Sequence, residues 1–229
     1  MGKRQAIKEK RKRDNIIKQG ITIFLILVAA VFIVGLMIYP NIKQTSQNQL
    51  VIPETVGKHK SIDMSMGDPN APLTVEVFSD YQCPYCGVYA QTVEPDFVKN
   101  YVDTGKVYYI FRPFNFLGPE STYAAEAAYC AVDQGDFWSF HDVLYHNMVG
   151  ENTGAINDEL LTNYAKAAGL DEKAFAACLQ SDKFVDQVEK DNNYANEAGV
   201  SATPSIKVGE EIVSFRDLVT TVDKALANQ

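Results

Sequence analysis

The sequence predicts an α/β domain that carries a helical insertion and follows one transmembrane helix. Three observations indicate this fold class. An apolar run at 73–78, a helical pattern that starts with two closely spaced cysteines, and a second apolar run at 107–111 follow one another, which is the order of a βαβ unit with a right-handed crossover. Helical periodicity then continues over about 119–199 before short strand patterns return. Near the N-terminus, a run of 19 uncharged residues separates a basic segment from the rest of the chain.

The N-terminal segment has the composition of a membrane anchor. Residues 1–20 contain eight Lys or Arg side chains against two acidic ones, and residues 21–39 carry no charge. A run of that length crosses a bilayer as a helix, and the positive-inside rule places the basic end in the cytoplasm. We therefore expect a single-pass protein of the cell membrane whose N-terminus is cytoplasmic and whose folded domain lies outside the cytoplasm. A cleaved signal peptide is the alternative, although residues 37–40 make a poor cleavage site.

A linker and an acidic domain follow the apolar run. Residues 40–61 are mostly polar and aperiodic, which predicts a linker ahead of a folded domain at 62–229. Beyond residue 20 the chain has 13 basic and 27 acidic side chains, a net charge of −14. This charge argues against nucleic acid as a partner and disfavours contact with anionic lipid headgroups.

Cys83-Pro-Tyr-Cys86 is the motif that carries chemistry, because two cysteines at this spacing can switch between a disulfide and a dithiol. The pattern from Pro84 to about Tyr101 predicts a helix, and Pro84 suits its first turn, where an N–H would have no partner. Backbone N–H groups and the helix dipole lower the pKa of a thiol at a helix start. We expect Cys83 to be a partly exposed nucleophile, and Cys86, one turn further, to be a buried resolving thiol.

Two other interpretations of this motif are weaker. Half of a zinc site would need a second cysteine pair or a histidine pair at ligand spacing, and the sequence has neither. We therefore expect no metal and no other cofactor. A static disulfide fits the spacing of the cysteines but not their position between a strand and a helix.

The remaining segments predict helices and then a hairpin. Apolar spacing over 119–199 predicts five helices, with Asn157 and Asp171 as N-caps of two of them. Trp138 is expected in the core, and His141 on a helix surface or partly buried, without a chemical role. Pro204 cannot donate within a sheet, so it is placed at the start of a strand. Two short strands, a turn between them and an amphipathic closing helix at 215–227 complete the chain.

Taken together, these motifs resemble the DsbA-like thiol–disulfide oxidoreductases of the thioredoxin superfamily. The resemblance covers about residues 62–229 and rests on the turn at 67–72, DYQCPYC at 80–86, the helical stretch at 130–145 and ATPSI at 202–206. It implies a thioredoxin-like fold with an inserted helical domain, and an enzyme that introduces disulfides into secreted or envelope proteins that contain cysteines. It also implies a quinone-linked membrane oxidase as the partner that reoxidises the enzyme.

The resemblance implies roles for individual residues. Cys83 would attack, Cys86 would resolve, and Pro204 would be a cis-proline that faces both. The backbone of Thr203 would pair with substrate. Pro84 and Tyr85 form the dipeptide between the cysteines, where they would tune the thiolate and meet the substrate.

One position departs from the family pattern. Many relatives carry a buried Glu six residues before the first cysteine, where it accepts a proton. That position is Val77 here, and strand alternation places Glu76 on the opposite face. Asp80 is too close to the loop to be assigned the role, so the sequence identifies no proton acceptor.

Cys130 and Cys178 are expected to form a structural disulfide. Free thiols are unusual outside the membrane, and an even count of four cysteines allows these two to pair. Relatives with cysteines in similar surroundings often join them.

Alternative functions stay open at the level of sequence. One is a disulfide reductase or isomerase of the same fold. Another is a non-catalytic thioredoxin-fold module that binds a metal or acts as a chaperone.

Overall fold

The computed structural model describes residues 20–21, 24–25, 27–30, 32–34, 50–59 and 63–228. The chain divides into two units, Met1–Gln49 and Leu50–Gln229. The described residues of the first unit are helical. Most of the basic segment at 1–20 and part of the predicted membrane span at 21–39 lie outside the described residues, and within the described part no helix is long and apolar enough to cross a membrane.

The second unit begins earlier than the predicted domain boundary at 62. Residues 50–59, which the sequence assigned to the linker, belong to the folded unit. Leu50 and Val56 pack against its core, and the backbone N–H of Val51 donates to the side chain of Asn147 over 2.8 Å. The apolar residues of this segment thus attach it to the domain. They are too few to show a periodic pattern in the sequence.

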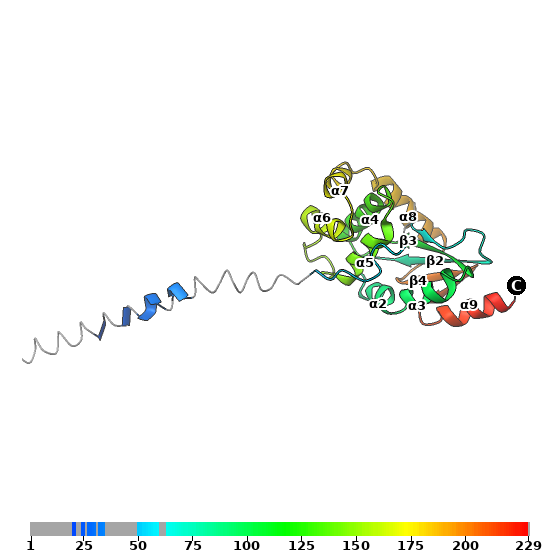
Figure 1. Cartoon of the computed structure of the whole chain (residues 1–229), viewed down its shortest axis with the longest axis horizontal. Coiled ribbons are helices and arrows are strands. Elements are labelled where there is room, and N and C mark those ends of the chain that lie inside the picture. Colours follow the sequence, from blue (N-terminus) through cyan, green and yellow to red (C-terminus); the bar gives the residue numbers. More distant parts are fainter. Residues whose placement is uncertain are drawn as a thin grey trace, which may run out of the picture. The chain divides into compact units, whose positions relative to one another are not determined.

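A five-stranded sheet in the order β1-β3-β2-β4-β5 forms the centre of this unit (Figure 1). β2 and β3 are parallel, and every other pair is antiparallel. Parallel pairing of β2 and β3 confirms the predicted βαβ unit, whereas the short β1 was not predicted. The strands are β1 Ser65–Met66, β2 Leu73–Ser79, β3 Val107–Pro113, β4 Ser205–Val208 and β5 Glu211–Ser214.

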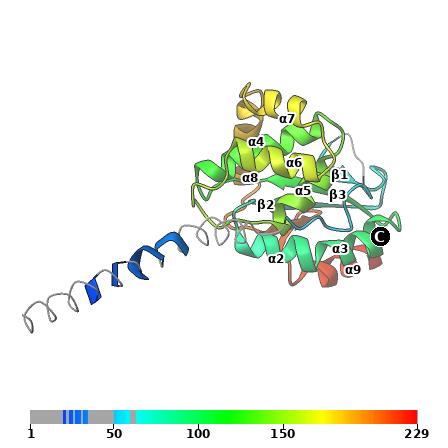
Figure 2. The same ribbon diagram turned by 60° about the vertical axis from the view of Figure 1, so that its left-hand side comes forward.

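Helices cover both faces of the sheet. Figures 1 and 2 show α4, α6 and α7 on one side of it and α2, α3 and α9 on the other. The helices before the insertion are α2 Pro84–Thr92, α3 Glu94–Phe97 and the π-helical turn η1 Val98–Val102. Those between β3 and β4 are α4 Pro119–Val132, α5 Phe137–His146, α6 Asp158–Ala167, α7 Glu172–Leu179 and α8 Val185–Glu197, and α9 spans Leu218–Ala227.

The helix that follows the cysteine motif is shorter than predicted. The sequence pattern suggested one helix from Pro84 to about Tyr101, but α2 ends at Thr92 and α3 begins at Glu94. Pro95 explains the break, because it has no N–H for the helical ladder and its ring crowds the preceding turn. Pro95 thus interrupts a helix that the apolar pattern alone would continue.

Side-chain caps and one disulfide hold the helical insertion together. Asn157 and Asp171 accept hydrogen bonds from the backbone N–H groups of Leu160 and Ala174, which confirms both predicted N-caps. Cys130 on α4 and Cys178 on α7 are joined in a disulfide with a Cα–Cα distance of 5.8 Å. The bond links the first and fourth helices of the insertion.

Candidate active site

The two cysteines of the motif lie where β2 leads into α2. Cys83 is the N-cap residue of α2, and Pro84 and Tyr85 form its first turn. Both cysteines are unbonded thiols. Cys83 is only 7% exposed, less than expected for the attacking residue, whereas Tyr85 beside it is 62% exposed. The dipeptide between the cysteines is therefore exposed to solvent, whereas both cysteine side chains are buried.

Several groups stabilise the thiolate form of Cys83. Its pKa is lowered from 9.0 to about 6, chiefly by a hydrogen bond from the Cys86 thiol, with burial opposing the shift. The side chain of Thr203 and the backbone N–H groups of Tyr85 and Cys86 lower the pKa further. The helix start predicted from the sequence thus contributes, but the neighbouring thiol contributes most.

Cys86 is in the opposite situation. It is 0% exposed, and burial raises its pKa well above the ordinary value, with the adjacent Cys83 adding to the increase. A hydrogen bond from Ser79 acts against this rise. The difference between the two thiols makes Cys83 the thiolate and keeps Cys86 protonated at neutral pH.

The loop before β4 brings a backbone carbonyl to the motif. The Thr203–Pro204 peptide bond is cis, and the Cys83 thiol lies 3.4 Å from the carbonyl oxygen of Thr203, to which it donates. These residues are separated by 120 positions in the sequence. The structure therefore brings Cys83, Cys86, Thr203 and Pro204 into one site.

Asp80 organises the loop that precedes Cys83. Its buried carboxylate accepts hydrogen bonds from four donors, which are the backbone N–H groups of Gln82, Phe116 and Leu117 and the hydroxyl of Ser121. A carboxylate whose oxygens are occupied in this way fixes the backbone geometry of the loop. The sequence analysis assigned Asp80 no role, and its position directly after a buried strand is the signal that could have indicated this one.

Glu120 ties a second loop to the motif. Its carboxylate accepts from the side chain of Gln82, which precedes Cys83, over 3.2 Å. It also accepts from the backbone N–H groups of Gly154 and Ile156. The segment 154–156 is thus hydrogen-bonded, through Glu120 and Gln82, to the loop that precedes Cys83.

The face assigned to Glu76 agrees with strand alternation. Its carboxylate contacts Arg112 at 2.7 Å and Lys207 at 3.6 Å and accepts from the hydroxyl of Tyr194 on α8. Val77, on the other face of β2, is fully buried. No carboxyl therefore occupies the position where many relatives carry a buried Glu.

A buried contact between His141 and Glu94, missed by the sequence interpretation, lies behind the motif. His141 is 1% exposed rather than at a helix surface, and its Nε2 lies 3.1 Å from Glu94. Glu94 also accepts from the hydroxyl of Tyr109, and Nδ1 of His141 faces the hydroxyl of Tyr81 at 3.4 Å. Trp138, in the core as predicted, packs at 5.1 Å from the His141 ring.

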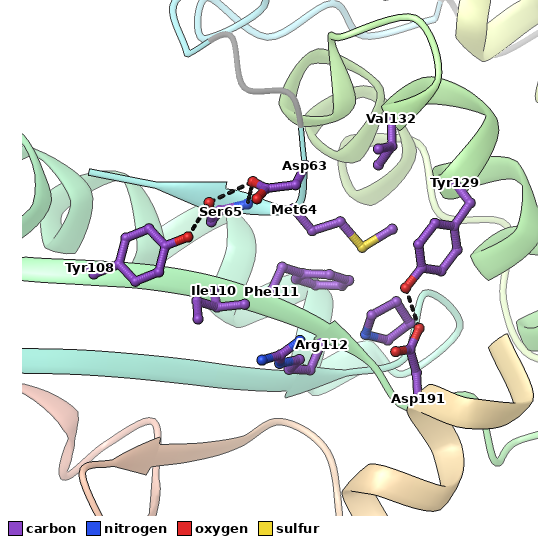
Figure 3. Close-up of a pocket in the computed structure, with 11 residues that line it drawn as sticks. Asp63, Met64, Ser65, Tyr108, Ile110, Phe111, Arg112, Tyr129, Val132 and Asp191 are labelled. Atoms are coloured by element: carbon purple, nitrogen blue, oxygen red, sulfur yellow. Dashed lines mark hydrogen bonds between the residues drawn. The ribbon is translucent and has the colours of Figure 1, made fainter. Parts of the chain in front are cut away.

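A separate cavity of about 290 Å³ lies between β3, α4 and α8 (Figure 3). In it the hydroxyl of Tyr129 donates to Asp191, and burial raises the pKa of Asp191. Neither cysteine of the motif lines this cavity. The candidate active site is therefore the surface around Cys83 and not this hollow.

The chain is similar to known proteins over most of its length. A family model described as thioredoxin matches residues 59–227. A probable disulfide bond formation protein D of Bacillus anthracis is 30% identical over 207 residues, which are 87% of this chain and 92% of that protein. The crystal structure of oxidised BdbD from Bacillus subtilis is similar with a TM-score of 0.66 and 28% identity, over 72% of this chain and 94% of that one. DsbA of Chlamydia trachomatis shares the fold with a TM-score of 0.65 at 22% identity, over 80% and 98% of the two chains.

Proposed function

The chain belongs to the thioredoxin family and is a DsbA-like thiol–disulfide oxidoreductase, and we propose that Cys83 and Cys86 carry its reaction. The enzyme introduces disulfides into proteins, as its relationship to disulfide bond formation protein D indicates. The contrast between the two thiols is the observation that carries this assignment. The pKa of Cys83 is lowered to about 6, whereas burial raises that of Cys86.

In this proposal the oxidised Cys83–Cys86 disulfide accepts two electrons from a substrate dithiol. A substrate thiolate attacks the sulfur of Cys83, and Cys86 leaves with the electron pair of the broken bond. The second substrate thiolate then attacks the mixed disulfide and displaces Cys83. A low thiol pKa makes Cys83 a good leaving group in this last step, so the substrate keeps its new disulfide.

The substrate chain would lie across the exposed face of the motif. Pro84 and Tyr85 are exposed, and the carbonyl of Thr203 lies at the sulfur of Cys83. An extended substrate segment can pair with backbone groups at the Thr203–Pro204 loop, in the manner of strand addition. We assign Thr203, Pro84 and Tyr85 to substrate binding and Pro204 to shaping the loop on which Thr203 sits.

We further propose that residues 21–39 anchor the enzyme in the cell membrane, with residues 1–20 in the cytoplasm and the catalytic domain outside. The uncharged run and the eight basic residues before it support this proposal. Disulfides persist in extracytoplasmic compartments, and the Cys130–Cys178 bond suits a structural role there. N-terminal sequencing of membrane-extracted protein that began after residue 39 would contradict it.

Reoxidation requires an electron acceptor, and we propose a quinone-linked membrane oxidase, as in the DsbA-like family that the sequence resembles. An enzyme held at the membrane would reach such a partner by lateral diffusion. Detergent-extracted membranes from cells that express this chain should reoxidise it in the presence of a quinone, and a Cys83→Ser variant should not accept electrons or pass them on.

The direct test of the cysteine roles uses a peptide with two thiols. Full-length oxidised enzyme should convert the peptide to its disulfide while becoming reduced in equal amount, as measured by alkylation and mass spectrometry. The reduced Cys86→Ser variant, mixed with the disulfide form of the peptide, should accumulate a mixed disulfide at Cys83, because the Cys83 thiolate attacks the peptide disulfide and no Cys86 thiol is present to resolve the product. A Cys83→Ser variant should be inactive. A mixed disulfide at Cys86 in place of Cys83 would contradict the assignment.

A further inference from the structure

Cys86 leaves the disulfide as a thiolate inside the protein, and the groups behind it determine how that charge is held. Cys86 has no exposed surface, and a buried anion without a hydrogen-bond donor is costly. The carboxyl that many relatives place near this sulfur is absent, because Val77 stands there among the strand neighbours Phe111 and Ile206. The chain must supply another polar partner.

Ser79 and Tyr145 occupy that place. Ser79 ends β2 on the same face as Val77 but two residues closer to the cysteines, and its hydroxyl, together with the backbone N–H of Asp80, acts to lower the pKa of the Cys86 thiol. The hydroxyl of Tyr145, on α5, lies 2.8 Å from that of Ser79. Both side chains are buried, at 2% and 1% exposure, so the protein itself fixes this pair.

Packing and burial hold Tyr145 in place beside Ser79. The Tyr145 ring packs at 4.9 Å from both Tyr81 and His141, which holds its hydroxyl in place. Burial raises the pKa of Tyr145 well above its usual value, so it keeps its proton. When Tyr145 donates to Ser79, the Ser79 hydroxyl is left to donate to the sulfur of Cys86.

We propose that Ser79 donates a hydrogen bond to the Cys86 thiolate as it leaves the disulfide, and that Tyr145 is the positioning residue that orients Ser79. The inference rests on the roles proposed for Cys83 and Cys86. A bond forms between the substrate sulfur and Cys83, the Cys83–Cys86 bond breaks, and its electron pair stays on Cys86, which later takes a proton from solvent. The substrate thiolate is the only reductant that the step requires.

The test measures the opening of the disulfide in the full-length oxidised chain, in nonionic detergent, by excess reduced glutathione. Tyr145→Phe should slow opening about tenfold and Ser79→Ala about ten- to hundredfold, the range that a hydrogen bond to a charged group covers. The double variant should be no slower than Ser79→Ala, because Tyr145 acts through Ser79. Ser79→Thr keeps the hydroxyl and should restore most of the rate.

A matched control and a second reaction separate this role from a structural one. Tyr164→Phe also removes one buried tyrosine hydroxyl, which donates to the backbone of Asn147, and should leave the rate unchanged. Alkylation of reduced Cys83 by iodoacetamide involves no departure of Cys86, so Tyr145→Phe should leave its rate unchanged. A distorted α2 would instead alter both reactions.

Three outcomes would overturn the inference. In the first, the disulfide of Tyr145→Phe opens as fast as that of Tyr164→Phe. In the second, the double variant slows opening by the product of the two single effects. In the third, Tyr145→Phe slows the alkylation of Cys83 as much as it slows the opening of the disulfide. If Ser79→Ala fails to fold, Tyr145→Phe decides alone, because it loses a single oxygen atom. A Cys83→Ser variant that still oxidised the peptide would refute the proposed function, whereas an inactive one beside an unaffected Tyr145→Phe refutes only the present inference.

Discussion

Lowering the pH from 8 to 5 should destabilise the reduced protein through Cys83. The folded state lowers the pKa of Cys83 from 9.0 to about 6, and the unfolded chain has no helix start and no fixed Cys86 or Thr203 to do so. The folded state therefore loses the proton at a lower pH than the unfolded state. The resulting stabilisation is fully present above about pH 9 and is lost as the pH falls through about 6.

The magnitude follows from the size of the shift. Three units correspond to about 4 kcal/mol at 1.36 kcal/mol per unit, of which linkage places about 2.7 kcal/mol between pH 5 and pH 8. Solvent at the exposed Pro84 and Tyr85 screens the interactions at Cys83, so we expect about 1–2 kcal/mol. In a domain of this size, that difference lowers the melting temperature by about 2–8 °C.

The assay is thermal unfolding of the full-length chain in nonionic detergent with a phosphine reductant, at pH 5, 6.5 and 8. Cys83→Ser is the control, because it retains every other titrating group. The melting temperature of the reduced wild-type protein should fall more between pH 8 and pH 5 than that of the variant. Parallel curves for the two proteins, or a thiolate absorbance that titrates near 9, would refute the reasoning.

Three further variants test two buried carboxyl groups and the disulfide of the helical insertion. Asp80→Asn should lower the free energy of unfolding, measured by chemical denaturation, by about 2–4 kcal/mol, because the amide replaces one acceptor oxygen by an NH₂ group that faces donors. A decrease below about 0.5 kcal/mol would contradict the role given to this carboxylate. Replacing Cys130 and Cys178 together by Ala should cost roughly 4 kcal/mol, the chain-entropy value for a separation of 48 residues, and wild-type stability in the double variant would show that the bond is not a staple. Glu94→Gln should destabilise the fold by about 1–3 kcal/mol, since an amide has only one oxygen to accept from Tyr109 and His141, whereas an unchanged melting temperature would contradict the role given to Glu94.

The parts of the fold that could be predicted from the sequence are those set by local pattern. Composition and element order predict the strand at 73–78 and its parallel partner β3. Asn157 and Asp171 are residue types that favour the N-cap position, and they predict the starts of two helices. The failures are also physical. Pro95 breaks a helix that periodicity alone would continue, and β1 is too short to leave a pattern.

The site was harder to predict because most of its contacts are non-local. The cysteine spacing identifies Cys83 and Cys86, but the pKa of Cys83 depends most on the Cys86 thiol and only in part on the helix start. Tyr145 meets Ser79 across 66 residues of sequence, and His141 meets Glu94 across 47. Sequence spacing carries no signal for pairs of this kind, since the packing of α5 against the α2 region creates them.

Ser79, the last residue of β2, and Asp80, which follows it, form contacts with different parts of the site. The Asp80 carboxylate spends its oxygens on backbone N–H groups and fixes the loop, whereas the Ser79 hydroxyl meets Cys86 and Tyr145. Unlike a carboxyl, a serine hydroxyl stays neutral. It can therefore donate a hydrogen bond to a thiolate without placing a second negative charge beside it. Val77 offers no acid to the sulfur of Cys86. Ser79 lies on the same face of the same strand and offers a hydroxyl group in its place.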